Sequence, residues 1–242
     1  MNKTQKISII IPVKNEEKNV NLLTKEISKY CSSLLFEVIF INDGSVDNTR
    51  NVLIDLKKNN NNLRIVNHLI SYGQSAALKS GILNAKHDII VTLDGDCQND
   101  PADIPKMLKV FENKKDRLLL IGGVRKNRKD NFGKRVGSKF GKVCRKFLLN
   151  DSHPDSGCGI KIFHKKLFLL MPYFDHMHRF LPALAKREGA EVLEFDVNHR
   201  PRLEGKSNYT NLGRLLVGIY DILGVIWLLK RAPKKFNSEE VK

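Results

Sequence analysis

Short β-branched runs alternate with helical stretches through the first half of the chain, and this alternation limits the fold more than any other feature. The strand-like runs are Ile7–Pro12, Glu37–Ile41, Leu63–Val66, Asp88–Leu93 and Leu118–Ile121. The helical stretches between them are Glu16–Cys31, Asp47–Lys58, Gln74–Ala85 and Pro101–Asn113. Strands that alternate with helices of this length form βαβ units. The pattern predicts an α/β fold with a doubly wound, Rossmann-like, mostly parallel sheet.

Two carboxylates and an amide follow the fourth strand-like run, in the segment Asp94-Gly95-Asp96-Cys97-Gln98. The carboxyl edge of an open α/β sheet is where such folds bind their ligands. Asp and Gln oxygens suit Mg²⁺ or Mn²⁺, and these ions commonly bridge a substrate diphosphate to the protein. The segment therefore indicates a divalent-cation site and a nucleotide diphosphate beside it.

Two earlier segments place further polar residues after strands. Pro12–Glu17 follows the first strand-like run, and Asn42–Thr49 follows the second. Carboxylates at strand ends can hold ribose hydroxyls or a base edge, and glycine allows close approach of a ligand. Each segment alone is also an ordinary turn and helix-capping signature. Their order along the chain, together with Asp94–Gln98, favours a nucleotide site.

The chain is strongly basic, with a net charge of +16. This charge predicts an anionic partner, which can be nucleic acid, an anionic membrane surface or a phosphorylated substrate. The four cysteines are scattered and form no Cys-x-x-Cys pair, which favours a reducing compartment. Because no signal-peptide h-region precedes the first strand, we expect a location on the cytoplasmic side.

Two segments of the second half could contact a membrane. Residues 125–146 contain ten Lys or Arg and one acid, with apolar residues at helical spacing, which predicts a basic amphipathic helix. Leu212–Leu229 is strongly apolar but is interrupted by Arg214 and Asp221, which argues against a simple transmembrane helix. Two alternatives stay open. The basic segment can be a solvated surface helix, and the apolar segment can be a helix packed on the core or a dimer contact.

Taken in order, the motifs resemble the family-2 glycosyltransferases with the GT-A fold. More narrowly, they resemble dolichol-phosphate mannose synthases and their bacterial polyprenyl-phosphate relatives. The resemblance covers about Ile7 to Arg231. The motifs are Pro12…Asn15-Glu16, Asp43-Gly44-Ser45…Asp47…Thr49, Gly73–Gly81, Asp94–Pro101, Asp155–Lys161, His178–Leu184 and His199–Tyr209.

The resemblance implies a role for each matching residue. Nucleotide-sugar contacts would come from Pro12, Asn15, Glu16, Asp43, Gly73, Gln74, Asp94 and Ser207. The metal, Mg²⁺ or Mn²⁺, would be held by Asp94, Asp96 and Gln98, and the catalytic residues would be Asp96 and Arg202. The acceptor phosphate would be bound by Arg125, Arg135 and Ser138.

The resemblance also implies an activity and a domain plan. We expect an inverting, metal-dependent transferase that moves a sugar from a nucleotide donor to a polyprenyl phosphate, held peripherally at an anionic membrane surface. Residues 1–211 would form the GT-A domain, with a basic interfacial helix region at 125–149, and 212–242 a C-terminal amphipathic helix and basic tail. A lipid phosphate is already an anion and needs no general base; Asp155, His178 and His199 are the weaker candidates for one.

Several alternatives stay open. The same fold and donor could serve a glycan or other soluble acceptor, and a catalytically silent membrane scaffold or a homo-oligomer would also fit. Nucleic acid is not an expected partner, because no reading module or stacking platform is recognisable. The chain departs from the family at Leu69–Tyr72, where relatives often carry Arg-Asn, and at Asn42, where Asp is frequent. These departures put some nucleotide contacts in question, and the donor sugar and base stay open.

Overall fold

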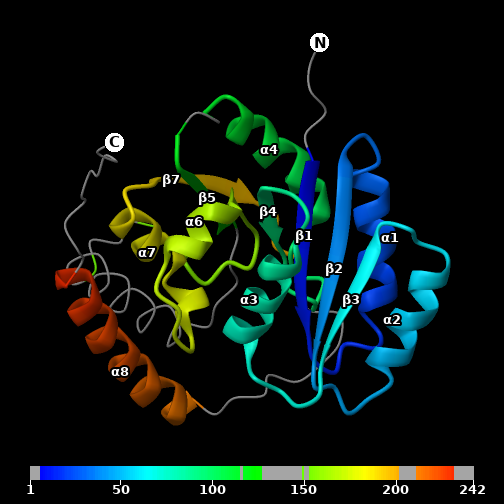
Figure 1. The fold of residues 1–242 in the computed structure, drawn as a ribbon, viewed down its shortest axis with the longest axis horizontal. Coiled ribbons are helices and arrows are strands. Elements are labelled where there is room, and N and C mark those ends of the chain that lie inside the picture. The colour runs from blue at the N-terminus through cyan, green and yellow to red at the C-terminus, as the bar shows by residue number, and fades with distance from the viewer. Residues whose placement is uncertain (1–5, 115–116, 127–148, 150–152, 202–210, 232–242) are drawn as a thin grey trace, which may run out of the picture.

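The computed structural model of the protein describes residues 6–114, 117–126, 149, 153–201 and 211–231 (Figure 1). In the last of these ranges, side chains are described from residue 218 onward. Most of the predicted basic region 125–149 therefore lies outside the described residues. So do four of the predicted site residues, which are Arg135, Ser138, Arg202 and Ser207.

A mixed sheet forms the centre of the described structure. Its seven strands have the order β3-β2-β1-β4-β6-β5-β7. Their bounds are β1 Lys6–Val13, β2 Leu35–Asp43, β3 Leu63–His68, β4 Ile89–Thr92, β5 Leu119–Arg125, β6 Lys161–His164 and β7 Glu191–Val197. The first four strands are parallel, β5 pairs in parallel with β7, and β6 runs antiparallel between β4 and β5. The predicted mostly parallel α/β sheet is confirmed.

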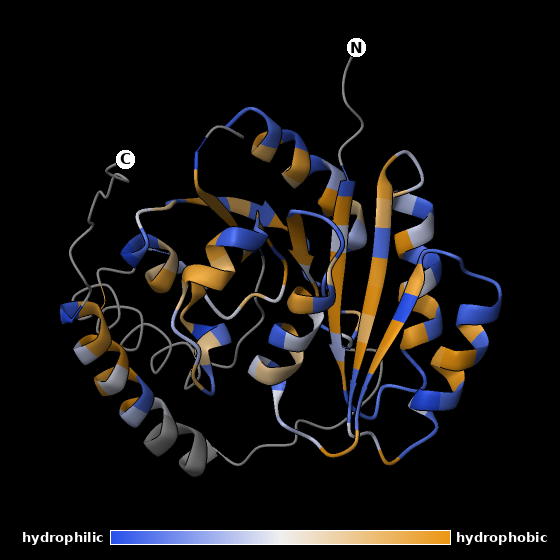
Figure 2. Cartoon of the chain, viewed as in Figure 1, coloured by the Kyte–Doolittle hydropathy of each residue, from blue (hydrophilic) through white to orange (hydrophobic). Residues whose placement is uncertain are grey.

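Helices cover both faces of the sheet, because the central strands are apolar on both sides. Ile9 and Ile11 of β1 pack with α1 (Val20–Tyr30), α2 (Thr49–Lys58) and α4 (Ile104–Glu112). Ile10 faces the opposite way, toward α3 (Gln74–Asn84), α6 (Lys165–Leu170), α7 (Leu181–Arg187) and α8 (Asn211–Lys230). Figure 2 shows the apolar residues concentrated on the strands between these two layers.

The chain changes direction across the sheet beside β1. Strands β2 and β3 extend to one side of β1, and β4 lies on its other side. Loops that leave the carboxyl ends of β1 and β4 therefore diverge and leave a crevice between them, which is where open α/β sheets bind ligands.

Some elements differ from the sequence prediction. Helix α1 begins at Val20 rather than Glu16, and a short 3₁₀ helix, η1 (Pro101–Asp103), precedes α4. A second 3₁₀ helix, η2 (Met177–Arg179), precedes α7. Strand β6 was not predicted, because it has only four residues and begins and ends with Lys161 and His164.

Helix α8 is packed on the domain and also has an exposed apolar side. Val225 is 1% exposed and belongs to the same cluster as α3 and α7. Ile219, Tyr220, Leu223 and Trp227 are exposed. In the part of the chain that the structure describes, no helix has the length and apolarity needed to cross a membrane. The described part of the helix is therefore packed on one side, and its contact with a membrane stays a prediction.

Candidate functional site

A polar cavity of about 440 Å³ lies at the carboxyl ends of β1, β2 and β4. It brings together seven of the residues predicted to bind nucleotide or metal: Pro12, Glu16, Asp43, Gly73, Gln74, Asp94 and Asp96. Its other lining residues were not predicted to belong to the site, and they are Val13, Lys14, Ser71, Ala77 and Gly95. We refer to this space as the first cavity.

Asn15, predicted to contact the nucleotide, instead joins two loops beside the first cavity. Its backbone N donates to Ser45 Oγ (3.0 Å), and its side-chain Oδ1 accepts from Val46 N (2.9 Å). Glu16 N donates to Thr49 Oγ1 (2.9 Å), which adds a second tie between the same loops. Asn15 adopts the left-handed backbone conformation, with φ 57°, that this arrangement requires. Its side chain does not line the first cavity.

Asp43 is buried and anchors the loop that forms one wall of the first cavity. Its Oδ1 accepts from His68 Nδ1 (2.7 Å) and Tyr72 N (2.9 Å). Its Oδ2 accepts from Ser71 Oγ (2.7 Å) and Gly73 N (2.9 Å). Burial opposes ionisation, but these hydrogen bonds outweigh it and lower the pKa of Asp43. Asp43 thus holds in place the loop Leu69–Tyr72, in which this chain departs from the family pattern.

Asp94 and Asp96 place two carboxylates on one wall of the first cavity. Gln74 Nε2 donates to Asp94 Oδ1 (2.9 Å), and Asn99 Oδ1 accepts from Asp94 N (3.1 Å). Burial and then the charge of Asp96 raise the pKa of Asp94 to about 6, against the smaller opposing effect of Lys161 and other cations. Two carboxylates that repel each other in this way form a favourable environment for a divalent cation.

Gln98, the third predicted metal ligand, lies beside this pair but outside the cavity lining. Its backbone N donates to Asp96 Oδ1 (3.2 Å), and its Nε2 donates to the carbonyl of Arg200 (3.3 Å). Among the described residues, no group of three His, Cys, Asp or Glu side chains forms a metal site. The predicted donor set is two carboxylates and one amide, which suits Mg²⁺ or Mn²⁺ if a substrate diphosphate and water supply the remaining ligands.

A second cavity of about 470 Å³ adjoins the first and shares Gln74 and Asp94 with it. Its other lining residues are Leu78, Thr92, Leu93, Ser156, Gly157, Cys158, Gly159, Lys161, His178, Arg179 and Leu181. Lys161 is 4% exposed, and its ammonium group donates to the carbonyl of Cys158. Burial lowers the pKa of Lys161, and nearby negative groups, Asp94 among them, oppose that shift. This second cavity thus has cationic side chains next to the carboxylate that it shares with the first.

Arg125 and Asp155 are each other's partners. Arg125 Nε and Nη2 donate to the two carboxylate oxygens of Asp155, each at 2.7 Å. This ion pair raises the pKa of Arg125, although burial opposes the shift. Neither residue lines the two cavities. Asp155, considered above as a catalytic base, is thus engaged in an ion pair, and Arg125, predicted to bind the acceptor phosphate, lies outside both cavities.

The two histidine candidates occupy different positions. His178 lines the second cavity, and its Nδ1 lies 2.8 Å from Ser75 Oγ. Burial, followed by the charge of Arg179, lowers the pKa of His178 to about 3, so the ring is neutral at neutral pH. His199 lies on neither cavity and forms an isolated β-bridge with Asn99.

Sequence reasoning missed the roles of Ser71, Lys161 and Arg179. Ser71 lies in the departing loop, and nothing in the sequence signalled that it would reach Asp43. Lys161 lies in the motif Asp155–Lys161 and Arg179 in the motif His178–Leu184. Their positive charge within these motifs was the only available signal. Their placement on one cavity depends on β6 and η2, neither of which was predicted.

Comparisons with known proteins agree with this fold. The family model described as Glycosyl transferase family 2 matches residues 8–169. The crystal structure of glucosyl-3-phosphoglycerate synthase from Mycobacterium tuberculosis with Mn²⁺, UDP-glucose and phosphoglyceric acid has a TM-score of 0.67, 17% identity, and coverage of 95% of this chain and 81% of that chain. The structure of the same enzyme with Mg²⁺ and UDP has a TM-score of 0.69 and 16% identity, and the match covers 95% of this chain and 81% of that chain. A crystal structure described as that of a mycobacterial protein has a TM-score of 0.71 and 17% identity, and the match covers 95% of this chain and 76% of that chain. At these identities the likeness shows the fold alone, and it confirms the predicted GT-A architecture.

Proposed function

This chain belongs to glycosyl transferase family 2, and from that premise we propose that it transfers a sugar from a nucleoside-diphosphate donor to an acceptor, with inversion and with the help of Mg²⁺ or Mn²⁺. The observation that carries the proposal is the first cavity, where Asp43 from the end of β2 meets Asp94 and Asp96 from the segment after β4. A nucleoside would lie against the loop held by Asp43, and the diphosphate would lie near the carboxylate pair.

The cation would be held by Asp94, Asp96 and Gln98. When bound, it stabilises the negative charge that develops on the leaving diphosphate. The N-terminus of α3 also borders the first cavity, at Gly73 and Gln74, and its backbone dipole favours a phosphate there. The neighbouring glucosyl-3-phosphoglycerate synthase was crystallised with Mn²⁺ and with Mg²⁺, which supports the same choice of ions for this chain.

The acceptor would enter the second cavity and carry an anionic group. Lys161 and Arg179 line that cavity, and Asp94 is shared between the two cavities, so donor and acceptor would meet at one carboxylate. Some of the matching structures of glucosyl-3-phosphoglycerate synthase were crystallised with phosphoglyceric acid, a small soluble anion. These observations favour the soluble acceptor over the polyprenyl phosphate expected first, and they give no support to the narrower resemblance to dolichol-phosphate mannose synthases.

Product formation with paired substrates tests this proposal. Purified protein with Mn²⁺ would be incubated with UDP-glucose, GDP-mannose or UDP-N-acetylglucosamine and an acceptor. The acceptors would be 3-phosphoglycerate, an oligosaccharide and undecaprenyl phosphate in detergent. We expect one donor to give a product with a phosphorylated soluble acceptor, and chelation of Mn²⁺ to stop it. If no donor binds or reacts with any acceptor, the proposed activity is wrong.

A polyprenyl phosphate at the cytoplasmic face of a membrane is the second candidate. One observation favours it, which is the exposed apolar side of α8 formed by Ile219, Tyr220, Leu223 and Trp227. In this reading residues 1–211 form the transferase domain, and 212–242 contact an anionic membrane through this side and the basic residues after it.

The protein's single tryptophan makes the second candidate directly measurable. Trp227 is 64% exposed, so its fluorescence should shift to shorter wavelength if α8 enters a bilayer surface. Vesicles of phosphatidylglycerol and of phosphatidylcholine would be compared. A shift with the anionic vesicles, together with exclusive glycosylation of undecaprenyl phosphate, would favour the second candidate over the soluble acceptor.

A further inference from the structure

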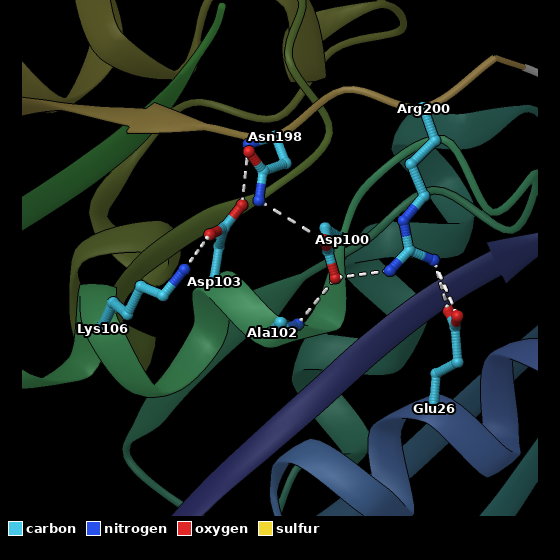
Figure 3. Close-up of polar contacts among 7 residues, drawn as sticks. All are labelled: Glu26, Asp100, Ala102, Asp103, Lys106, Asn198 and Arg200. Carbon is cyan, nitrogen blue, oxygen red and sulfur yellow. Dashed lines mark hydrogen bonds and ion pairs between the residues drawn. The ribbon is translucent and has the colours of Figure 1, made fainter.

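Arg200, in the segment that follows β7, pairs with Glu26 of α1 and with Asp100, which follows the loop that carries Asp96 and Gln98 (Figure 3). We propose that Arg200 is a positioning residue, which holds Gln98 in the place from which its amide can ligate a divalent cation. The inference rests on the proposed function only in taking Asp94–Gln98 as the cation-binding loop. It concerns a residue to which the sequence motifs gave no role of its own.

The backbone of Arg200 is paired with the backbone and side chain of Gln98. Arg200 N donates to the carbonyl of Gln98 (3.0 Å), and Gln98 Nε2 donates to the carbonyl of Arg200 (3.3 Å). The bridge between Asn99 and His199 continues the same antiparallel pairing. Because the amide nitrogen of Gln98 makes this bond, the amide oxygen is the end that a cation would take.

The Arg200 side chain anchors this pairing to two other elements. Its Nη1 donates to both carboxylate oxygens of Glu26 on α1, at 2.7 and 2.8 Å. Its Nη2 donates to Asp100 Oδ1 (2.6 Å), and that oxygen also accepts from Ala102 N (3.0 Å) at the start of η1. The planar guanidinium can reach both carboxylates at once, which a lysine ammonium does less well.

Asn198 strengthens the attachment two residues before Arg200. Its backbone N donates to Asp103 Oδ2 (2.8 Å), and its side chain reaches Asp100 Oδ2 (3.5 Å). Figure 3 shows these contacts on both sides of η1. The segment from Asn198 to Arg200 is therefore fixed at both ends.

The loop needs this support because its central residue is strained. Cys97 has a φ of 59°, in the left-handed region that residues with a side chain rarely adopt, and it lies between the two predicted ligands Asp96 and Gln98. Such a conformation persists when surrounding contacts enforce it. Burial of the Cys97 side chain enforces it from the α1 side, where Sγ lies 3.5 Å from the carbonyl of Asn19. The pairing with Arg200 enforces it from the other side.

Electrostatics and positioning predict opposite results when Arg200 is replaced. Arg200→Gln removes a positive charge near the loop and leaves Glu26 and Asp100 without their cation. By charge alone the loop would then attract Mn²⁺ more strongly. If Arg200 acts by holding Gln98, Mn²⁺ binding weakens instead, by about 10–100-fold, as is usual for residues that orient a metal ligand.

Arg64 provides a matched control, because it lies near the start of β3, at the edge of the sheet opposite to the predicted cation loop. Arg64 Nη1 pairs with Glu37 Oε2 at 2.7 Å, and its side chain is 31% exposed, the same as that of Arg200. Arg64 also donates to the carbonyl of Asn84 (2.7 Å). Arg64→Gln therefore removes a comparable ion pair and a tie to a neighbouring element, away from the predicted cation loop.

The test combines Mn²⁺ binding with hydrogen exchange. Mn²⁺ affinity would be measured by calorimetry in the presence of UDP or GDP, and amide exchange of residues 95–101 would be measured by mass spectrometry without metal. We expect Arg200→Gln to weaken Mn²⁺ binding and to speed exchange in 95–101, and Arg200→Lys to have an intermediate effect. Arg64→Gln should leave both readings within about twofold of wild type, even where it lowers the melting temperature.

Each outcome decides the inference. Unchanged or tighter Mn²⁺ binding by Arg200→Gln, or unchanged exchange in 95–101, would overturn it. If Arg200→Gln does not fold, Glu26→Gln provides a milder form of the same test, because it weakens one of the two carboxylate contacts that anchor the Arg200 side chain. We then expect a smaller change in the same direction in both readings. If wild-type protein binds no Mn²⁺ with either nucleotide, the proposed function fails, and the exchange measurement still decides whether Arg200 holds the loop.

Discussion

Gly159 lies so close to Asp94 that a Cβ atom at position 159 would come within 2.2 Å of Asp94 Oδ2. The same atom would lie 2.7 Å from Asn99 Oδ1, which accepts from Asp94 N. Gly159 is also fixed from the β4 side, because Thr92 Oγ1 donates to its carbonyl (2.6 Å). The Asp94 carboxylate, which both cavities share, therefore lies directly against the backbone of Gly159.

Gly159→Ala should displace Asp94, because the backbone at 159 is held by Thr92 and the Asp94 side chain must move away from the added methyl group. We expect kcat/KM to fall by about 10²-fold, the usual effect of a displacement of about 1 Å in an active site. The melting temperature should also fall. Gly157→Ala is the stability control, because its Cβ would meet nothing nearer than Arg125 Nη2 at 3.9 Å. Equal melting temperatures for the two variants would contradict this account.

Asp96→Asn should remove most of the metal-dependent activity. The change keeps the shape of the side chain, but replaces a charged ligand with a neutral one, and we expect kcat to fall by about 10²–10³-fold at saturating donor. The rate would be measured against Mn²⁺ concentration, with Asp55→Asn as the control, because the Asp55 side chain is 70% exposed and pairs with Lys58 on α2. Full activity of Asp96→Asn would remove the cation site from the mechanism.

Asp43→Asn should destabilise the protein at neutral pH by about 1–3 kcal/mol, because an amide cannot accept the hydrogen bonds that both carboxylate oxygens accept. The pKa of Asp43 is lowered on folding, so its ionised form stabilises the protein above about pH 4. That contribution disappears as the pH falls through the lowered value. Urea unfolding at pH 7 and at pH 3 would measure the difference between variant and wild type, which should shrink at the lower pH. A difference that does not change with pH would show that the charge of Asp43 is not involved.

His178 should make folding less favourable in acid. Its pKa falls from 6.5 to about 3 on folding, so between these values the unfolded chain binds a proton that the folded chain does not. Stability therefore rises with pH across this range, by up to about 1.4 kcal/mol per pH unit from this group, and the contribution is complete above 6.5.

His178→Gln should reduce that slope, since glutamine can still exchange a hydrogen bond with Ser75 but does not titrate. The free energy of unfolding would be measured from pH 4 to 7, with His87→Gln as the control for loss of a histidine. A slope unchanged in His178→Gln would mean that the ring is protonated in the folded protein.

Much of the fold could be predicted from the order of local patterns. The apolar runs at Ile7–Pro12 and Asp88–Leu93 became β1 and β4, because a strand buried on both faces is apolar throughout. The polar residues after these strands were expected to meet, since the carboxyl ends of parallel strands share one edge of a sheet. Pro12, Asp43 and Asp94 do line one cavity.

The sequence by itself thus determined the α/β class, the edge that holds the site and the carboxylate pair within it. Only the tertiary structure decided which of the polar residues are occupied elsewhere: Asn15 joins two loops, and Arg125 and Asp155 pair with each other. It also decided that Lys161 lies beside Asp94, and that Arg200 is bonded to Glu26, 174 residues away in the chain. Local patterns follow from hydrogen bonding and burial within one element, whereas these partnerships depend on how distant elements pack, and the spacing of residues along the chain does not specify that packing.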